Sequence, residues 1–111
     1  MLPACITILF GAMKEVDVQI RRAHCLEDYQ RIVELEKEVW SFTDTADLTA
    51  VPILMIANEF GGLVLVAEES SRLIGFSMAN LGWTRGKKLF WWSHMTAVGP
   101  AISKQRCRIR T

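Results

Sequence analysis

The sequence predicts a single α+β domain, in which an antiparallel sheet of about four strands carries two helices packed together on one side. The hydrophobic patterns run in the order strand, helix, helix and then three strands, with no internal repeat or low-complexity linker between them. The chain has 111 residues, of which 50% are hydrophobic and 23% are charged. That length suits one globular domain, and the apolar fraction argues against intrinsic disorder.

The balance of charge and the cysteine pattern exclude several classes of protein. The formal net charge is only +1, so there is no basic surplus to hold a nucleic-acid backbone or an anionic membrane surface. The three cysteines, Cys5, Cys25 and Cys107, form no CxxC pair, and the two histidines share no metal-ligand spacing with them. We therefore expect no disulfide scaffold and no metal site, and a reducing cytoplasm as the location.

Residues 1–15 are interpreted as an apolar N-terminal extension. They carry no basic region and no small-residue cleavage site, and they are shorter than the ~20 apolar residues that a membrane span needs. One interpretation is a translated upstream stretch, with Met13 as the natural start. The alternative is a short strand or helix that covers an exposed apolar face.

A strand and a helix open the domain proper, which we place at residues 16–100. Val18 and Ile20 alternate with polar neighbours, which is the pattern of a strand with one buried face. The period then changes to three and four residues, which predicts a helix from about Leu26 to Trp40. The expected apolar stripe of this helix consists of Tyr29, Ile32, Val33, Val39 and Trp40.

A second, shorter helix follows a polar stretch. Pro52 suits a first helical position, and the glycine pair Gly61-Gly62 supplies a C-terminal stop. The expected apolar stripe of this helix consists of Ile53, Ile56, Ala57 and Phe60.

Three strands complete the predicted sheet. Residues 63–67 are a continuous apolar run, expected to be a strand covered on both faces, and residues 73–81 return as the second strand of a hairpin. After a loop at residues 82–88, Leu89–Val98 is the longest candidate strand. Its alternation places one set of side chains on one face (Trp92, His94, Thr96 and Val98) and a second set on the other (Trp91, Ser93, Met95 and Ala97).

Five segments, taken in order, resemble one known superfamily. They are the strand Ile20–Ala23, the helix end Val39-Trp40, the glycine pair and strand from Gly61 to Ala67, Leu73-Ile74-Gly75-Phe76, and Trp92–Val98. Together they resemble the N-terminal half of a GNAT-superfamily acyltransferase, and they look most similar to uncharacterised predicted acetyltransferases with a Ser-His-Met-x-Ala-Val strand. The resemblance covers about residues 16–100.

The resemblance implies an enzyme that transfers an acetyl group from acetyl-CoA to an amine on a small molecule or a protein. In such folds the fourth strand offers backbone groups to the pantetheine arm, and the following loop and helix hold the pyrophosphate. The matching cofactor-binding positions are Met95, Thr96, Ala97, Val98 and Gln105. His94 is the candidate catalytic base, because an imidazole exchanges protons near pH 7. The alternative for His94 is a partly buried structural residue.

Residues 101–111 depart from the family pattern. Arg108 and Arg110 stand where the family has glycines in its phosphate loop, and an arginine side chain would occupy the place of the pyrophosphate. We therefore expect a degenerate basic tail, weak or absent binding of acetyl-CoA, and a truncated chain that is inactive alone.

Two other functions stay open at this point. A non-catalytic GNAT-like interaction module would pair with another chain through the edge of the fourth strand, which lacks a parallel neighbour. A protein that binds small apolar ligands is supported only by aromatic content, chiefly Trp83, Trp91 and Trp92, for which a core under the helices is the other interpretation. The same exposed edge predicts a homodimer or larger assembly.

Overall fold

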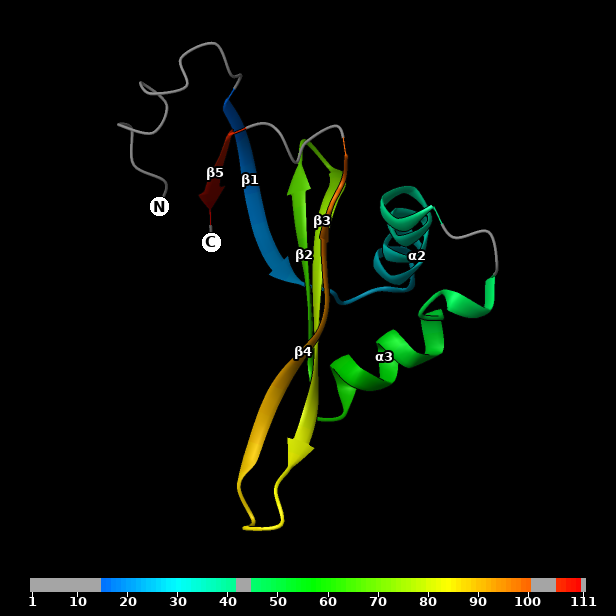
Figure 1. Cartoon of the computed structure of the whole chain (residues 1–111). Coiled ribbons are helices and arrows are strands. Elements are labelled where there is room, and N and C mark those ends of the chain that lie inside the picture. The colour runs from blue at the N-terminus through cyan, green and yellow to red at the C-terminus, as the bar shows by residue number, and fades with distance from the viewer. Residues whose placement is uncertain (1–14, 42–44, 101–105, 111) are drawn as a thin grey trace.

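A computed structural model describes residues 15–41, 45–100 and 106–110 (Figure 1). Within them lie, in order, β1 (Glu15–Arg22), α2 (Leu26–Trp40), the 3-10 helix η1 (Thr45–Asp47), α3 (Val51–Glu59), β2 (Leu63–Glu69), β3 (Arg72–Trp83), β4 (Leu89–Val98) and β5 (Arg106–Arg110). The described strands form one sheet in the order β4-β3-β2-β1-β5. The predicted α+β class, with four antiparallel strands and two helices, is confirmed.

The C-terminal strand differs from the basic tail that we expected. Strand β5 runs parallel to β1, and its residues Arg106–Arg110 pair with Glu15–Gln19. Pairing of this kind uses backbone groups, so a run of arginines does not prevent it, and the free edge of β1 accepts an extended segment within reach. Residues 1–14 and 101–105, with the candidate Gln105 and most of the N-terminal extension, lie outside the described residues.

Both helices pack on one face of the sheet (Figure 1), and the core lies between them and the strands. Helix α2 has the predicted bounds, and Ser41 ends it in a left-handed conformation, with its backbone N–H donating to the carbonyl of Lys37. The largest apolar side chains of this core are Tyr29, Ile32, Leu35, Leu54, Val64, Val66, Phe76 and Met78. None of the described helices is both long and apolar enough to cross a bilayer.

The buried face of α3 differs from the predicted stripe. Leu54 and Asn58 are buried, together with Ala57, the one member of the stripe that was predicted correctly. The side chains expected to be buried but found exposed are Ile53, Ile56 and Phe60, at 53%, 55% and 74%. Because the first turns of α3 are apolar on nearly every side, hydrophobic spacing alone does not select the face that meets the sheet.

Strand β2 is fully covered on one face only. Val64 and Val66 are completely buried beneath the helices, whereas Leu63, Leu65 and Ala67 on the other face are half-buried. The expectation of cover on both faces is therefore wrong for this strand, because both helices lie on the same side of the sheet (Figure 1).

Strands β3 and β4 form a long hairpin that extends past the helices (Figure 1). Strand β4 has the predicted bounds, and β3 continues two residues beyond its predicted end to Trp83. The tryptophans Trp83, Trp91 and Trp92 are 70%, 57% and 45% exposed, so the core interpretation of these side chains is wrong. The reason is geometric, since their part of the hairpin runs beyond the helices that would cover it.

Candidate functional site

His94 occupies a bulge in β4. Met95 pairs with Met78 of β3 and Ser93 pairs with Ala79, so His94 is the extra residue between two consecutive pairs. The His94 ring is exposed, and it stands edge-to-face against Trp92 with ring centres 5.2 Å apart. A bulge interrupts the alternation of side chains and redirects the one it carries. The sequence gives no signal for it, so the simple alternation expected along β4 holds only on either side of His94.

The four β4 residues that follow the bulge divide between the two faces of the sheet. Met95 and Ala97 pack against the helical core, and the Met95 sulfur accepts a hydrogen bond of 2.9 Å from the Thr49 hydroxyl. The hydroxyl of Thr96 pairs with that of Ser77 at 2.8 Å. The structure thus brings the predicted Met95, Thr96, Ala97 and Val98 together in one extended segment directly after His94.

An apolar groove crosses β2, β3 and β4 beside this segment. It has a volume of about 160 Å³, which is below the roughly 300–1,000 Å³ of a site for a whole small-molecule ligand. Its lining includes Ile20, Leu65, Gly75, Ser77, Thr96 and Val98. The groove has room for a short acyl group and too little for a complete coenzyme A.

Glu36 of α2 is a buried carboxylate that the sequence analysis missed. Its side chain is fully buried, Oε1 accepts the backbone N–H of Thr49 at 2.8 Å, and Oε2 has no hydrogen-bond partner. Burial raises the pKa of Glu36, opposed by its hydrogen bonds from Thr49 and by the charge of nearby His94. A signal for this position does exist, because Glu36 follows Ile32 by four residues and Tyr29 by seven on the apolar stripe of α2.

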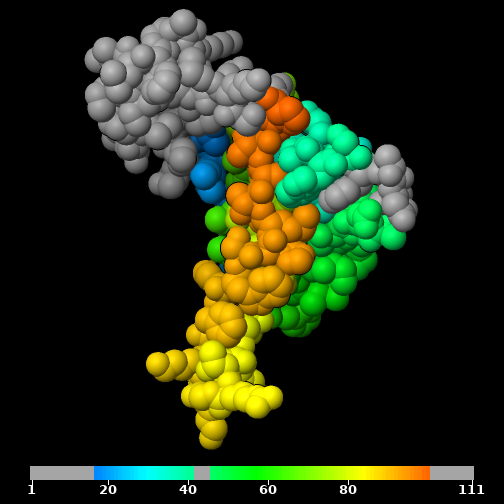
Figure 2. All heavy atoms as spheres, viewed as in Figure 1, coloured from blue at the N-terminus to red at the C-terminus, as the bar shows by residue number. Residues whose placement is uncertain are grey.

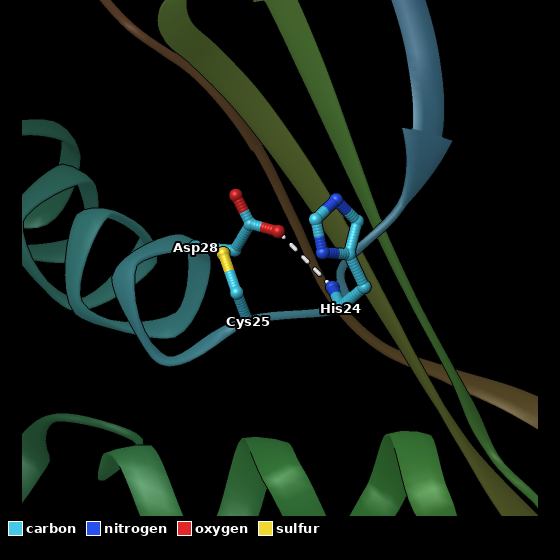
Figure 3. A group of neighbouring side chains, drawn as sticks. All are labelled: His24, Cys25 and Asp28. Carbon is cyan, nitrogen blue, oxygen red and sulfur yellow. Dashed lines mark hydrogen bonds between the residues drawn. The ribbon is translucent and has the colours of Figure 1, made fainter.

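A second cluster lies where β1 turns into α2 and consists of His24, Cys25 and Asp28 (Figure 3). The potential ligand atoms of these three residues lie within 4.8 Å of one another. The Asp28 carboxylate, however, already accepts two hydrogen bonds from the Arg21 guanidinium, at 2.7 and 2.8 Å, and one from the His24 backbone N–H at 3.0 Å. A carboxylate so engaged with a cation is poorly suited to bind a metal ion, so we interpret the cluster as a tether at the start of α2.

Another groove lies away from β4. It has a volume of about 680 Å³ between α2 and the turn from β2 to β3. Its lining includes Glu27, Arg31, Glu34, Glu38 and Arg72. Arg31 is already bound to Glu27 at 2.7 Å and to the Ser71 carbonyl at 3.2 Å. This groove is a solvated charged surface that brings together none of the predicted site residues.

Comparison with known proteins gives similarities at the level of structure. No protein-family model matches the chain, and no curated protein sequence matches it. An aminoglycoside acetyltransferase from an uncultured soil metagenomic sample, solved with trehalose, superposes with a TM-score of 0.67 at 12% identity, over 85% of this chain and 77% of that one. A possible acetyltransferase from Clostridium difficile 630 superposes with a TM-score of 0.60 at 19% identity, over 78% of this chain and 60% of that one.

A third similar structure is the glucosamine N-acetyltransferase region of a fungal multi-domain beta-N-acetylglucosaminidase. It has a TM-score of 0.63 at 10% identity over 81% of this chain and 10% of the fungal chain. At such identities the likeness concerns the fold, and it agrees with the resemblance seen in the sequence. The strand order, the two helices on one face and these superpositions together show that the chain has the same fold as these acetyltransferase structures.

Proposed function

We propose that the chain is an N-acyltransferase of the GNAT type, which transfers an acetyl group from acetyl-CoA to an amine acceptor. The observation that carries this proposal is strand β4, where a bulge at His94 is followed by four extended residues beside an apolar groove of acyl size. Similar folds belong to proteins described as acetyltransferases of an aminoglycoside and of glucosamine. The acceptor is accordingly proposed as a primary amine on a small molecule or a protein, in a reducing cytoplasm where Cys25 stays a free thiol.

In the proposed reaction, the backbone of Met95–Val98 hydrogen-bonds the pantetheine amides as a strand edge bonds an extended peptide. The amine nitrogen attacks the thioester carbonyl, the carbon–sulfur bond of the tetrahedral intermediate breaks, and the thiolate leaves. His94 accepts the proton that the amine loses and returns a proton to the thiolate, so the charges balance.

Acetyl-CoA fits the described residues only in part, which supports weak binding. The groove suits the acyl end of the molecule, but residues 106–110, which belong to the expected phosphate loop, form a strand on β1. That strand lies at the edge of the sheet opposite β4, so its backbone is far from the place where a pyrophosphate would meet the fourth strand. We further propose that this chain is inactive alone.

The test is an NMR titration of the ¹⁵N-labelled full chain with acetyl-CoA and, separately, with S-acetylpantetheine, which lacks the pyrophosphate. We expect both ligands to shift the amide signals of Met95–Val98, with similar dissociation constants of about 1 mM, while the amides of α3 stay unchanged. Micromolar binding of acetyl-CoA would contradict the expected weak site. Unchanged signals at Met95–Val98 with 10 mM of either ligand would overturn the proposed function.

A further inference from the structure

Strand β4 is an edge strand over its whole length. Among the residues that the structure describes, it pairs with β3 on one side and has no strand on the other. Figure 2 shows this strand in orange along the face of the molecule turned to the viewer, with the hairpin projecting beyond the body. The N–H and C=O groups on such an edge are a ready template for another strand.

The projecting end of the hairpin presents a large apolar surface, which we call the aromatic arm. Its members are Leu81, Trp83, Leu89, Phe90, Trp91 and Trp92, which are 44%, 70%, 70%, 43%, 57% and 45% exposed. Taking about 200 Å² for each side chain, the arm exposes roughly 650 Å² of apolar surface in total, divided between the two faces of the hairpin because neighbouring strand residues point to opposite sides. Both faces of the arm therefore carry exposed apolar side chains beside the free edge of β4.

The charges near the arm favour a second copy of this chain in antiparallel orientation. No lysine, arginine, aspartate or glutamate occurs from residue 89 to 98, whereas Arg85, Lys87 and Lys88 precede the strand. Parallel pairing of two copies would place these cations side by side. Antiparallel pairing about Trp91 separates the two Lys88 residues by roughly 20 Å at ~3.4 Å a residue, which is more than the ~10 Å screening length of 0.1 M salt.

The bulge at His94 defines where such pairing ends. Residues 89–93 form a regular stretch of β4, and the extra residue then breaks the ladder. Trp91 lies at the centre of this stretch, and its indole N–H donates to the Gly61 carbonyl at 2.6 Å, which orients the ring. In an antiparallel pair centred there, each Trp91 faces its counterpart, and aromatic cross-strand pairs stabilise a sheet.

We propose that two copies of this chain form a symmetric dimer by antiparallel pairing of residues 89–93 of β4, with the two-fold axis at Trp91. The two sheets join into one, and side chains of the two aromatic arms meet across the new pair of strands. The segment Met95–Val98 stays outside the interface, so this proposal does not depend on the proposed function.

Light scattering on the full chain at 50 µM tests the dimer. We expect twice the 12.6 kDa mass of one chain, with dissociation on dilution. Trp91→Lys and Trp91→Glu should each raise the dimer dissociation constant at least 100-fold, because each places like charges opposite one another at the two-fold axis. An equimolar mixture of the two variants should restore the dimer.

Two further variants keep the test decisive. Ile53→Lys alters a side chain of α3 that is 53% exposed, and it should leave the dimer intact. Leu89→Lys also removes an arm side chain without touching the bond from Trp91 to Gly61, and it should weaken the dimer with the fold preserved by NMR. A monomeric wild-type chain, equal weakening by Ile53→Lys, or a mixture that stays monomeric would each overturn the proposal.

Discussion

Glu36 and Thr49 are joined by a hydrogen bond of 2.8 Å between the carboxylate Oε1 and the backbone N–H. The contact fixes α2 to the residues that lead into α3, just beneath the strand that carries His94. The other carboxylate oxygen of Glu36, Oε2, is buried without a hydrogen-bond partner, which is unfavourable for a charged group. Burial in this position raises the pKa of the Glu36 carboxyl group, so the stability of the fold should depend on pH.

The first prediction concerns that dependence. Because burial raises the pKa of Glu36 above its usual 4.5, the folded state binds its proton more tightly than the unfolded state, and stability falls as pH rises from the unfolded value through the folded one. Glu36→Gln keeps an oxygen for the Thr49 N–H but cannot titrate. In urea unfolding, the free energy of unfolding of the wild type relative to that of Glu36→Gln should therefore fall as pH rises above 4.5. His94, whose charge also acts on Glu36, is kept in both proteins, and equal pH slopes would contradict the prediction.

The second prediction concerns the ion pair between Arg21 and Asp28. The Asp28 side chain is only 3% exposed, and the Arg21 guanidinium holds its pKa well below the usual range. Asp28→Asn should lower the free energy of unfolding by about 2 kcal/mol at pH 7. This value is smaller than that for a fully buried ion pair, because the Arg21 side chain is 25% exposed.

The same pair sets the acid dependence of stability. A depressed pKa contributes stability above the unfolded value of 3.8 and loses it as pH falls toward the folded value, so the difference between the wild type and Asp28→Asn should narrow from pH 4 to pH 2. Glu27→Gln is the matched control, since its pair with Arg31 is largely exposed and should contribute less than about 0.5 kcal/mol. Chemical unfolding of the wild type and both variants at pH 7, 4 and 2 measures these free-energy differences. A loss of stability in Glu27→Gln equal to that in Asp28→Asn would contradict the prediction.

The third prediction concerns Asn58, a buried amide at the end of α3. Its oxygen accepts from Arg22 Nε at 2.8 Å and from the Val64 N–H at 3.1 Å, and its nitrogen donates to the Ala23 carbonyl at 2.6 Å and the Tyr29 hydroxyl at 2.8 Å. Asn58→Ala leaves these groups without their partner and should lower the free energy of unfolding by about 3 kcal/mol.

The neighbouring Glu59 is exposed and provides the comparison for Asn58. Glu59→Ala should change stability by less than about 0.5 kcal/mol. Thermal unfolding should therefore give a much lower melting temperature for Asn58→Ala than for Glu59→Ala. Similar melting temperatures would indicate a general effect of alanine in α3 and would contradict the prediction.

The fourth prediction concerns Gly62, where α3 meets the sheet. A Cβ atom at this position would lie 2.5 Å from the carbonyl oxygens of both Ala57 and Ala79, and both of these contacts are with backbone atoms rather than with the end of a flexible side chain. Gly62→Ala should therefore destabilise the fold by at least about 2 kcal/mol. Gly86 in the hairpin loop has open space around it, with Thr84 Oγ1 at 3.7 Å as its near neighbour. Urea unfolding of both variants tests this, and Gly86→Ala should leave the free energy of unfolding nearly unchanged. An unchanged free energy of unfolding in Gly62→Ala would contradict the prediction, because it would show that the neighbouring backbone shifts to relieve the crowding.

The elements that could be predicted from the sequence are those whose apolar residues repeat with one clear spacing. Helix α2 and strand β4 have the bounds that the spacing of apolar residues predicts, because each has a run long enough to separate a period of 3.6 from a period of 2. The second helix has no such contrast around its axis, so its position was predictable and its buried face was not. The pairing of β5 with β1 depends on backbone groups far apart in the sequence, which no local pattern reports.

The candidate site was predictable in its outline only. The resemblance in the sequence placed His94 and the four residues after it, and the structure sets them in one extended segment. The bulge that displaces His94 depends on the register of two strands, which a single sequence does not state. Glu36 and Asn58 were missed because charged and amide side chains are usually exposed, and their burial here depends on partners elsewhere in the chain.

The parallel pairing of β1 with β5 also has a consequence for how the chain reaches this fold. The hairpins β2–β3 and β3–β4 join neighbours in sequence, whereas the pair Glu15↔Arg106 joins residues about 90 positions apart. Closing so long a loop costs more chain entropy than closing a hairpin, and the reward is a short two-stranded contact. The β2–β3–β4 meander should therefore assemble early, β1 should dock on it next, and β5 should join last and detach first. Native-state hydrogen exchange would then find the lowest opening free energy in β5.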